Sequence, residues 1–299
     1  MLKIAYNSIY KLPLPEGHRF PMEKYDLIPE QLMHEGIIEE CNLFYPNKIK
    51  DLWLKYAHDS EYIDKLKRLN LSKSEVRKTG FPLTKKLIER EYIITEGTKT
   101  CVDYAIKYGI SANIAGGTHH AFRNKGEGFC LFNDVAVASY YAIKKYKLKS
   151  ILIIDLDVHQ GNGTASIFSN NDHVFTFSMH GKNNYPFKKE ISTLDIELED
   201  GTSDLEYLRA LNDNLSIISQ RFSPQIIFYI SGVDILSTDK LGRLNISKNG
   251  CKNRDEIVYE YALKTNSPII TSMGGGYSQN INDIVEAHCN TFKCMSFLV

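Results

Sequence analysis

Acidic and imidazole side chains alternate directly after an apolar run near the middle of the sequence. Residues 150–154 form a β-branched stretch typical of a buried strand, and Asp155 ends it. Asp157 and His159 come next, and because residues two apart on a strand point to the same side, they should face the same space. These groups could hold a metal ion, whereas a purely structural interpretation has the carboxylates capping the following helix.

A third aspartate follows another long apolar run. Asp234 comes shortly after residues 225–230 and would bring a ligand from a second strand. Zinc in hydrolytic sites commonly takes three protein ligands and leaves one position for water. The sequence therefore predicts that Asp157, His159 and Asp234 hold Zn²⁺, although Fe²⁺ or Co²⁺ would also accept these ligands.

Two further strand ends carry groups suited to acid–base chemistry. His119 and His120 follow a pair of glycines, and Tyr277 follows a triple glycine at 274–276. Histidine can act as base and as acid near neutral pH, and a tyrosine hydroxyl can hydrogen-bond a developing oxyanion. The alternative is that the histidines are packed in the core and that the glycines form a tight turn with a surface tyrosine.

The strands that must position these side chains are short, apolar and separated by helical segments. Strands are predicted at 2–6, 113–115, 150–154, 174–180, 225–230 and 268–273. Helices are predicted from about 21 to 39, after 59, and at 83–92, 97–108, 134–146, 164–168 and 205–222, with a loop at 181–201. This alternation predicts an α/β protein with a parallel sheet covered on both faces, in one domain spanning residues 1–299. Ligand groups at the carboxyl ends of its strands would share one rim.

The composition argues against nucleic acid and membranes as general binding partners. Lys+Arg 36 and Asp+Glu 36 give a formal net charge of +0, so no global field draws the protein onto nucleic acid or an anionic membrane. No apolar run approaches the ~18 residues of a membrane span, which makes a cytoplasmic location the default expectation. The six cysteines lack metal-binding spacing and are expected to be reduced. The sequence does not indicate an oligomeric state.

Five segments occur in the order found in histone deacetylases, and the sequence resembles that family over nearly its whole length. They are residues 116–120, 126–130, 155–163, 232–234 and 274–277. The segments 18–25 and 159–162 resemble most the class IV branch and its bacterial relatives. The resemblance implies an arginase-like, three-layer α/β/α fold with an eight-stranded parallel sheet. It also implies a lysine deacetylase or deacylase, a zinc-dependent amidohydrolase that acts on acyl-lysine in proteins or peptides.

The resemblance further implies roles for individual residues. Asp157, His159 and Asp234 would hold a zinc ion that polarises the amide carbonyl and activates water. His120 would be general base and then acid, His119 would assist with Asp155 as its partner, and Tyr277 would bind the oxyanion. The lysine tunnel would be formed by Gly128, Phe129 and Tyr185. A structural K⁺ would be held by Asp155, Asp157, His159, Ser178 and Met179.

One position departs from the class I pattern, and several substrates stay open. Asn162 stands where class I enzymes have an aspartate that partners the residue matching His120, and an amide stabilises imidazolium less than a carboxylate does. Asn162→Asp is therefore expected to shift one limb of the pH–rate profile.

Acetylpolyamines would need acids at the tunnel mouth, and no such group is identified. Longer fatty acyl groups, and a non-catalytic reader of acyl-lysine, are further alternatives.

Overall fold

The structure is a computed structural model that describes residues 1–296. Within them, one sheet contains eight parallel strands in the order β2-β1-β3-β8-β7-β4-β5-β6. The strands are β1 (Lys3–Ala5), β2 (Leu43–Phe44), β3 (Ile110–Asn113), β4 (Ile151–Asp155), β5 (Val174–Gly181), β6 (Leu194–Leu198), β7 (Ile226–Ile230) and β8 (Ile269–Ser272). The predicted parallel α/β architecture is confirmed, and all strands present their carboxyl ends at the same edge.

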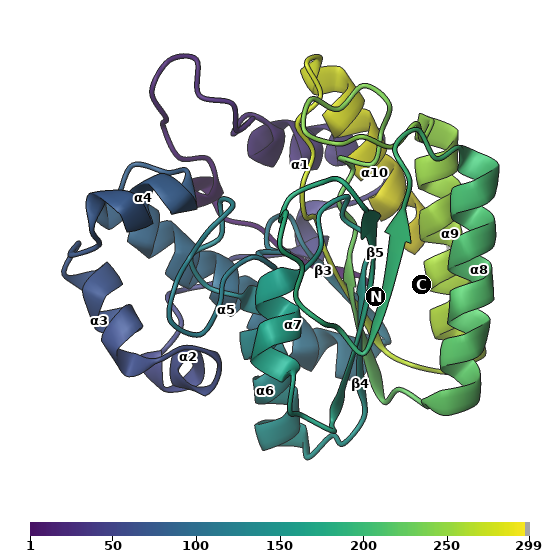
Figure 1. Ribbon diagram of the computed structural model, residues 1–299, viewed down its shortest axis with the longest axis horizontal. Coiled ribbons are helices and arrows are strands. Elements are labelled where there is room, and N and C mark those ends of the chain that lie inside the picture. Colours follow the sequence, from purple (N-terminus) through teal and green to yellow (C-terminus); the bar gives the residue numbers. More distant parts are fainter. Residues whose placement is uncertain (297–299) are drawn as a thin grey trace.

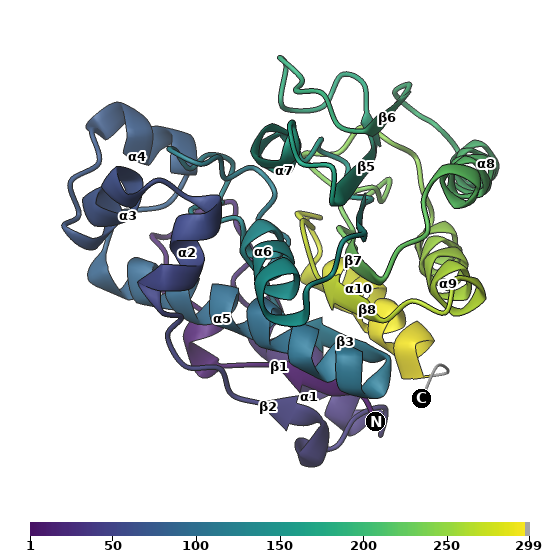
Figure 2. The same ribbon diagram turned by 90° about the horizontal axis from the view of Figure 1, so that it is seen from below.

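Helices cover both faces of this sheet. They are α1 (Lys24–His34), α2 (Asp51–Ala57), α3 (Ser60–Lys67), α4 (Lys73–Thr79), α5 (Lys85–Tyr108), α6 (Asp134–Tyr146), α7 (Asn162–Phe168), α8 (Asp204–Arg221), α9 (Lys248–Lys264) and α10 (Ile281–Ser296), with 3-10 turns η1 (Ser8–Tyr10) and η2 (Glu40–Asn42). Helices α5, α6 and α7 lie on one face, and α1, α8, α9 and α10 lie on the other (Figures 1 and 2). Helices α2, α3 and α4 pack outside the first layer. No helix in the described part is long and apolar enough to span a bilayer.

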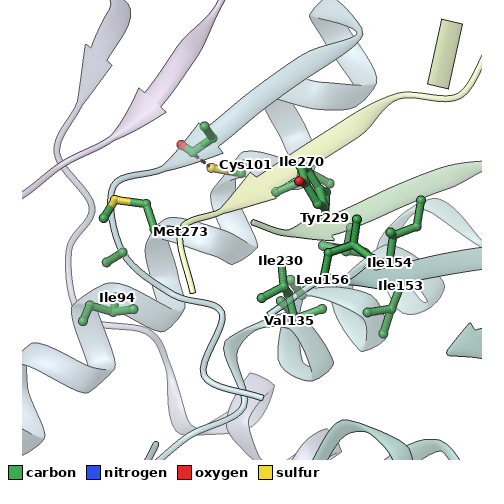
Figure 3. Packing of buried hydrophobic residues seen from close by; sticks show 14 of the residues in the cluster. Ile94, Cys101, Val135, Ile153, Ile154, Leu156, Tyr229, Ile230, Ile270 and Met273 are labelled. Atoms are coloured by element: carbon green, nitrogen blue, oxygen red, sulfur yellow. Dashed lines mark hydrogen bonds between the residues drawn. The ribbon is translucent and has the colours of Figure 1, made fainter. Parts of the chain in front are cut away.

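The central strands are buried on both faces, which explains their unbroken apolar sequences. Every residue of β4, β7 and β8 is buried. Figure 3 shows side chains of these strands, among them Ile154, Tyr229 and Ile270, packed together in the core. The polar side chains that follow these strands are therefore carried by the most rigid part of the molecule.

The helices predicted at 83–92 and 97–108 form one continuous helix, α5. The glycine at position 97 suggests a break between two helices, but Gly97 lies inside α5, where this helix meets the sheet. A Cβ at this position would lie 2.7 Å from the hydroxyl of Tyr10 and 2.8 Å from the amide nitrogen of Asn113. Close packing, not a break in the helix, therefore accounts for the glycine.

The segment 181–201, predicted as a loop, contains the edge strand β6. It pairs in parallel with β5, with Phe177 opposite Leu194. Asp195 and Glu197 alternate with Leu194 and Ile196, and most of the strand is only partly buried. Charged residues are common on edge strands, so a search for continuous apolar runs does not find this one.

A buried histidine connects the start of α6 to the loop before it. The Nδ1–H of His58 donates to the carbonyl oxygen of Phe122 at 2.9 Å, and its Nε2 accepts from the backbone N–H of Asn133 at 3.0 Å. Burial lowers the pKa of His58 to about 4. Protonation would also remove the acceptor that Asn133 uses, so the fold requires the neutral ring.

His58 should make the stability of the protein fall with acidification. In the unfolded chain His58 has a pKa of ~6.5, whereas in the folded chain its pKa is about 4. Its contribution to the free energy of unfolding is therefore complete above pH ~6.5 and is lost as the pH falls toward 4. The full loss is about 3 kcal/mol. Urea unfolding at pH 7.5 and pH 5 should show a smaller pH dependence for His58→Gln than for the wild type. Equal pH dependence in both proteins would contradict this assignment.

Candidate active site

The three residues predicted as metal ligands come together at the carboxyl ends of β4 and β7. Asp157, His159 and Asp234 are buried, and one ligand atom of each lies within 4.8 Å of the others. The Nδ1 atom of His159 is 3.0 Å from Oδ1 of Asp157 and 3.1 Å from Oδ2 of Asp234. Because β4 and β7 are neighbours in the sheet, residues just beyond their ends necessarily meet.

Backbone groups fix the two carboxylates in place. The N–H of Gly275 donates to Oδ2 of Asp157 at 2.7 Å, and the N–H of Val158 donates to Oδ1 of Asp234 at 2.9 Å. A Cβ on Gly275 would collide with Asp234 Oδ2. The triple-glycine turn therefore allows the backbone after β8 to approach the carboxylates directly.

The charges of this group suit a divalent cation. Burial, and then the charge of Asp157, raises the pKa of Asp234 to about 7. Burial alone would lower the pKa of His159, but its hydrogen bonds with Asp157 and Asp234 raise that pKa to about 10. Two carboxylates in a buried site repel one another unless a positive charge lies between them. One imidazole nitrogen and two carboxylates are donors that Zn²⁺, Fe²⁺ and Co²⁺ accept, so the residues present fit a metal.

The paired histidines lie beside this group, and each has its own partner. Nδ1 of His119 is 2.7 Å from Oδ2 of Asp155, and Nδ1 of His120 is 2.7 Å from Oδ1 of Asn162. The centres of the two rings are 4.1 Å apart. Because an amide oxygen only accepts, Nδ1 of His120 must carry the proton, and a neutral ring then has its lone pair on Nε2.

The two histidines are held in different protonation states. Burial alone would lower the pKa of His119, but the carboxylates of Asp155 and Asp157 raise it to about 9. Burial, followed by the charges of His119 and His159, lowers the pKa of His120 well below its usual range. At neutral pH the ring of His119 is therefore charged and the ring of His120 is neutral, and two such different environments are typical of acid–base sites.

Glu127 is a component of the site to which the sequence interpretation gave no role. The amide nitrogen of Asn162 donates to Oε1 of Glu127 at 2.8 Å, and Nζ of Lys125 lies 3.2 Å from Oε2. Since a carboxylate can only accept, Glu127 forces the amide nitrogen of Asn162 toward itself and the amide oxygen toward His120. The signal in the sequence was an acidic residue within the glycine-rich segment 126–130, which leads into the predicted tunnel.

Aromatic side chains line the approach to the metal group. The ring centre of Phe129 is 5.8 Å from that of Tyr277, and the ring centre of Tyr185 is 5.0 Å from that of His120. Phe20, which the sequence interpretation did not assign to the tunnel, adds a ring 5.2 Å from Phe129. Gly128 fits because a Cβ there would lie 2.5 Å from the ring of His120. The three predicted tunnel residues are therefore found together.

Tyr277 presents a protonated hydroxyl. Burial, followed by the negative charges of Asp157 and Asp234, raises its pKa well above the usual value. Its backbone N–H donates to Oδ2 of Asp239 at 2.6 Å, which fixes the end of the glycine turn. The side chain is therefore a hydrogen-bond donor throughout the neutral pH range.

Two connected cavities lead to the site. The outer one, of about 350 Å³, is open to the surface, and the inner one, of about 40 Å³, borders the metal group. Residues that line both are His120, Gly128, Phe129, His159 and Tyr277. The inner cavity is bounded further by Tyr25, Arg90, Ile94 and Cys130. A narrow substrate side chain could therefore reach the metal group from the surface.

The residues expected to bind K⁺ come from β4, the segment just after it, and the neighbouring strand β5. Asp155 at the end of β4 lies opposite Ser178 on β5, and Ser178 and Met179 are both buried. The hydroxyl of Ser178 is 2.9 Å from Nδ1 of His180. The five predicted residues thus lie on or just after two adjacent strands.

Comparison with known proteins identifies relatives over this whole region. Residues 18–292 match the histone deacetylase domain. An uncharacterized protein of Picosynechococcus sp. is 37% identical over 285 residues, and the match covers 95% of each chain. Histone deacetylase 2 of Arabidopsis thaliana is 30% identical over 292 residues, and the match covers 93% of this chain and 75% of the relative. The crystal structure of an HDAC homolog from Aquifex aeolicus superposes with a TM-score of 0.84 at 25% identity, covering 97% and 82%. The matched region includes every strand end that carries the site.

Proposed function

Because the chain belongs to the histone deacetylase family, we propose that it hydrolyses the amide bond of acyl-lysine side chains with a divalent metal, Zn²⁺ in the first instance. One observation carries the proposal. The buried group of Asp157, His159 and Asp234 lies beside a charged and a neutral histidine at the inner end of an aromatic tunnel. Fe²⁺ and Co²⁺ are the alternatives for the metal.

The residues of this chain would divide the reaction between them. A metal held by Asp157, His159 and Asp234 would supply Lewis acidity to the substrate carbonyl and to water. His120 takes a proton from the attacking water at Nε2 and returns it to the departing lysine amine. Tyr277 donates its hydroxyl hydrogen to the carbonyl oxygen as negative charge develops there. His119, whose Nδ1 is 2.7 Å from Oδ2 of Asp155, would assist electrostatically beside this oxyanion.

The size of the inner cavity supports a short acyl group. It measures about 40 Å³ against about 350 Å³ for the outer cavity, and the side chains of Tyr25, Arg90 and Ile94 bound its inner end. We therefore favour acetyl-lysine over long fatty acyl-lysine as the substrate.

A panel of one peptide carrying acetyl-, butyryl-, octanoyl- or myristoyl-lysine tests the proposal. The metal-loaded protein should release acetate fastest, and His120→Ala, which lacks the base, should be slower on every substrate. Binding of acyl-lysine with no turnover in the metal-loaded protein would favour the acyl-lysine reader instead. Faster release of myristate than acetate would contradict the assignment of the inner cavity.

Two finer assignments complete the proposal. We infer that K⁺ is held near the metal group by Asp155, Asp157, His159, Ser178 and Met179, which is supported by their adjoining positions on two strands. The segments 18–25 and 159–162 support a place in the class IV branch. Potassium-dependent activity at constant ionic strength, with Na⁺ as the control, tests the first assignment.

Asn162→Asp should reduce activity because of Glu127, and the loss should be reversible. The new carboxylate would face Glu127 at the position of a 2.8 Å hydrogen bond, so we expect kcat to fall about tenfold through repulsion and displacement of His120. In Asn162→Asp/Glu127→Gln the glutamine can donate to the aspartate, and kcat should recover and the pH–rate profile should shift. Glu127→Gln alone is the matched control. A double variant as impaired as Asn162→Asp would contradict this pairing.

A further inference from the structure

The outer cavity has a mouth of one charge. Its lysine and arginine lining residues are Arg19, Lys78 and Arg243, and no carboxylate belongs to the lining among the described residues. All three side chains are exposed. The whole chain has a formal net charge of +0, so this is a local concentration of positive charge and not a reflection of overall composition.

Hydrogen bonds hold the three segments that carry these cations at the mouth. The N–H of Gly128 donates to the carbonyl oxygen of Lys78 at 3.0 Å, which attaches the end of α4 to the tunnel wall. Beside Arg19, the ring of His18 is 2.9 Å from the carbonyl oxygen of Gly80. The segment before Arg243 is fixed where Asp239 accepts from the N–H groups of residues 241 and 242 at 2.8 and 3.0 Å.

Two of the three cations form no ion pair with an acidic side chain among residues 1–296. Arg243 forms an ion pair with Asp200 at 3.2 Å. Within residues 1–296, no ion pair involves Arg19 or Lys78. The guanidinium of Arg19 lies 5.1 Å from the ring centre of Phe129, so its charge stands at the entrance of the tunnel.

We propose that the mouth selects acyl-lysine flanked by acidic residues, so that the substrate is an acidic segment of a peptide or protein. This inference rests on the proposed function and adds the substrate class. Arg19 and Lys78 can form ion pairs with carboxylates on either side of the acyl-lysine. Arg243 adds a third positive charge at the mouth. The outer cavity runs from these cations to the tunnel residues Phe129 and Tyr277, so residues next to a bound lysine would lie beside the cations. The same charges repel an acylated polyamine, whose remaining amines are cationic.

The expected effect is moderate and sensitive to salt. Pairs between exposed charges are weakened by water, and at 0.1 M ionic strength screening acts over about 10 Å. Two or three such pairs should therefore change kcat/KM about tenfold, mainly through KM, and the change should shrink as salt is added.

The test uses three acetyl-lysine peptides of equal length whose neighbouring residues are all Glu, all Gln or all Lys. The metal-loaded wild type should prefer the Glu peptide over the Gln peptide about tenfold, with the Lys peptide and acetylputrescine poorer still. Arg19→Gln/Lys78→Gln should bring the Glu and Lys peptides within about threefold of each other. Lys107→Gln/Lys149→Gln, which removes two exposed cations just before the amino ends of β3 and β4, at the opposite edge of the sheet, should keep the wild-type preference.

Two controls separate this inference from the proposed function. Turnover of the Gln peptide reports catalysis alone, and anisotropy of fluorescent acetyl peptides on His120→Ala reports charge preference without turnover. Equal binding of the Glu and Lys peptides, or a preference that survives Arg19→Gln/Lys78→Gln, would overturn the inference. Free Nε-acetyl-lysine used as well as the Glu peptide would overturn the choice of an acidic polymer in favour of a small carboxylate.

Discussion

Removal of divalent metal should reduce acetyl-lysine hydrolysis to the uncatalysed background, a loss of more than about 10³-fold, and added Zn²⁺ should restore it. The reason is the chemistry at the ends of β4 and β7, where Asp157, His159 and Asp234 offer three ligand atoms within 4.8 Å of one another. His120 alone cannot activate both the water and the carbonyl. Activity should be measured after dialysis against chelator and again after stoichiometric metal is returned.

A binding measurement makes this prediction independent of catalysis. Metal binds only the folded site, so saturating Zn²⁺ should stabilise the protein by about 2.7 kcal/mol at 100 times its dissociation constant, seen as a raised Tm. Asp234→Asn should lose this stabilisation and bound metal. Asp213→Asn, which changes an exposed carboxylate on α8, is the matched control. Full activity in metal-free protein would refute the metal-dependent mechanism.

Tyr277→Phe should lower kcat by about 10²–10³ with little change in KM. The hydroxyl is protonated at neutral pH, and it is needed most when the carbonyl oxygen becomes an oxyanion. Phenylalanine keeps the ring contacts with Phe20 and Phe129, which lie 5.9 and 5.8 Å away, so the tunnel should keep its shape. Steady-state kinetics on the acetyl peptide measure the effect.

A second tyrosine in the same tunnel provides the comparison. Tyr185→Phe removes a hydroxyl near the outer cavity while leaving Tyr277 in place, and we expect kcat within about threefold of the wild type. Retention of most activity in Tyr277→Phe would exclude the oxyanion role. An equal loss in both variants would indicate that the tunnel, and not the hydroxyl of Tyr277, had been disturbed.

The central sheet was predictable from the sequence because its strands are buried on both faces. The apolar runs before Asp155, Asp234 and Tyr277 identify strands directly, and parallel strands must end at one edge, so the meeting of these side chains followed from the pattern. The edge strand β6 was not predicted, because charged residues interrupt its apolar sequence. The helix break predicted at Gly97 was wrong for a different reason. A glycine required by close packing cannot be distinguished in the sequence from a glycine that ends a helix.

Contacts between loops were not predictable in the same way. The bond from Asn162 to Glu127 joins two segments whose side-chain directions depend on the tertiary path of each loop. The meeting of Arg19, Lys78 and Arg243 at one mouth likewise depends on three connections between strands and helices that have no repeating pattern. The roles assigned to the site residues remain predictions, whereas their positions relative to the sheet are established.

The attachment of α4 to the tunnel wall has an evolutionary consequence. The carbonyl oxygens of Lys78 and Thr79 accept from the N–H groups of Gly128 and Phe129 at 3.0 and 2.9 Å, so the bonds use main-chain atoms only. The side chain at position 78 can therefore be exchanged without loosening the wall beside His120. Under the proposed function, selection could change the preferred substrate through one exposed residue at a time, while the buried groups around Asp157 stay unchanged.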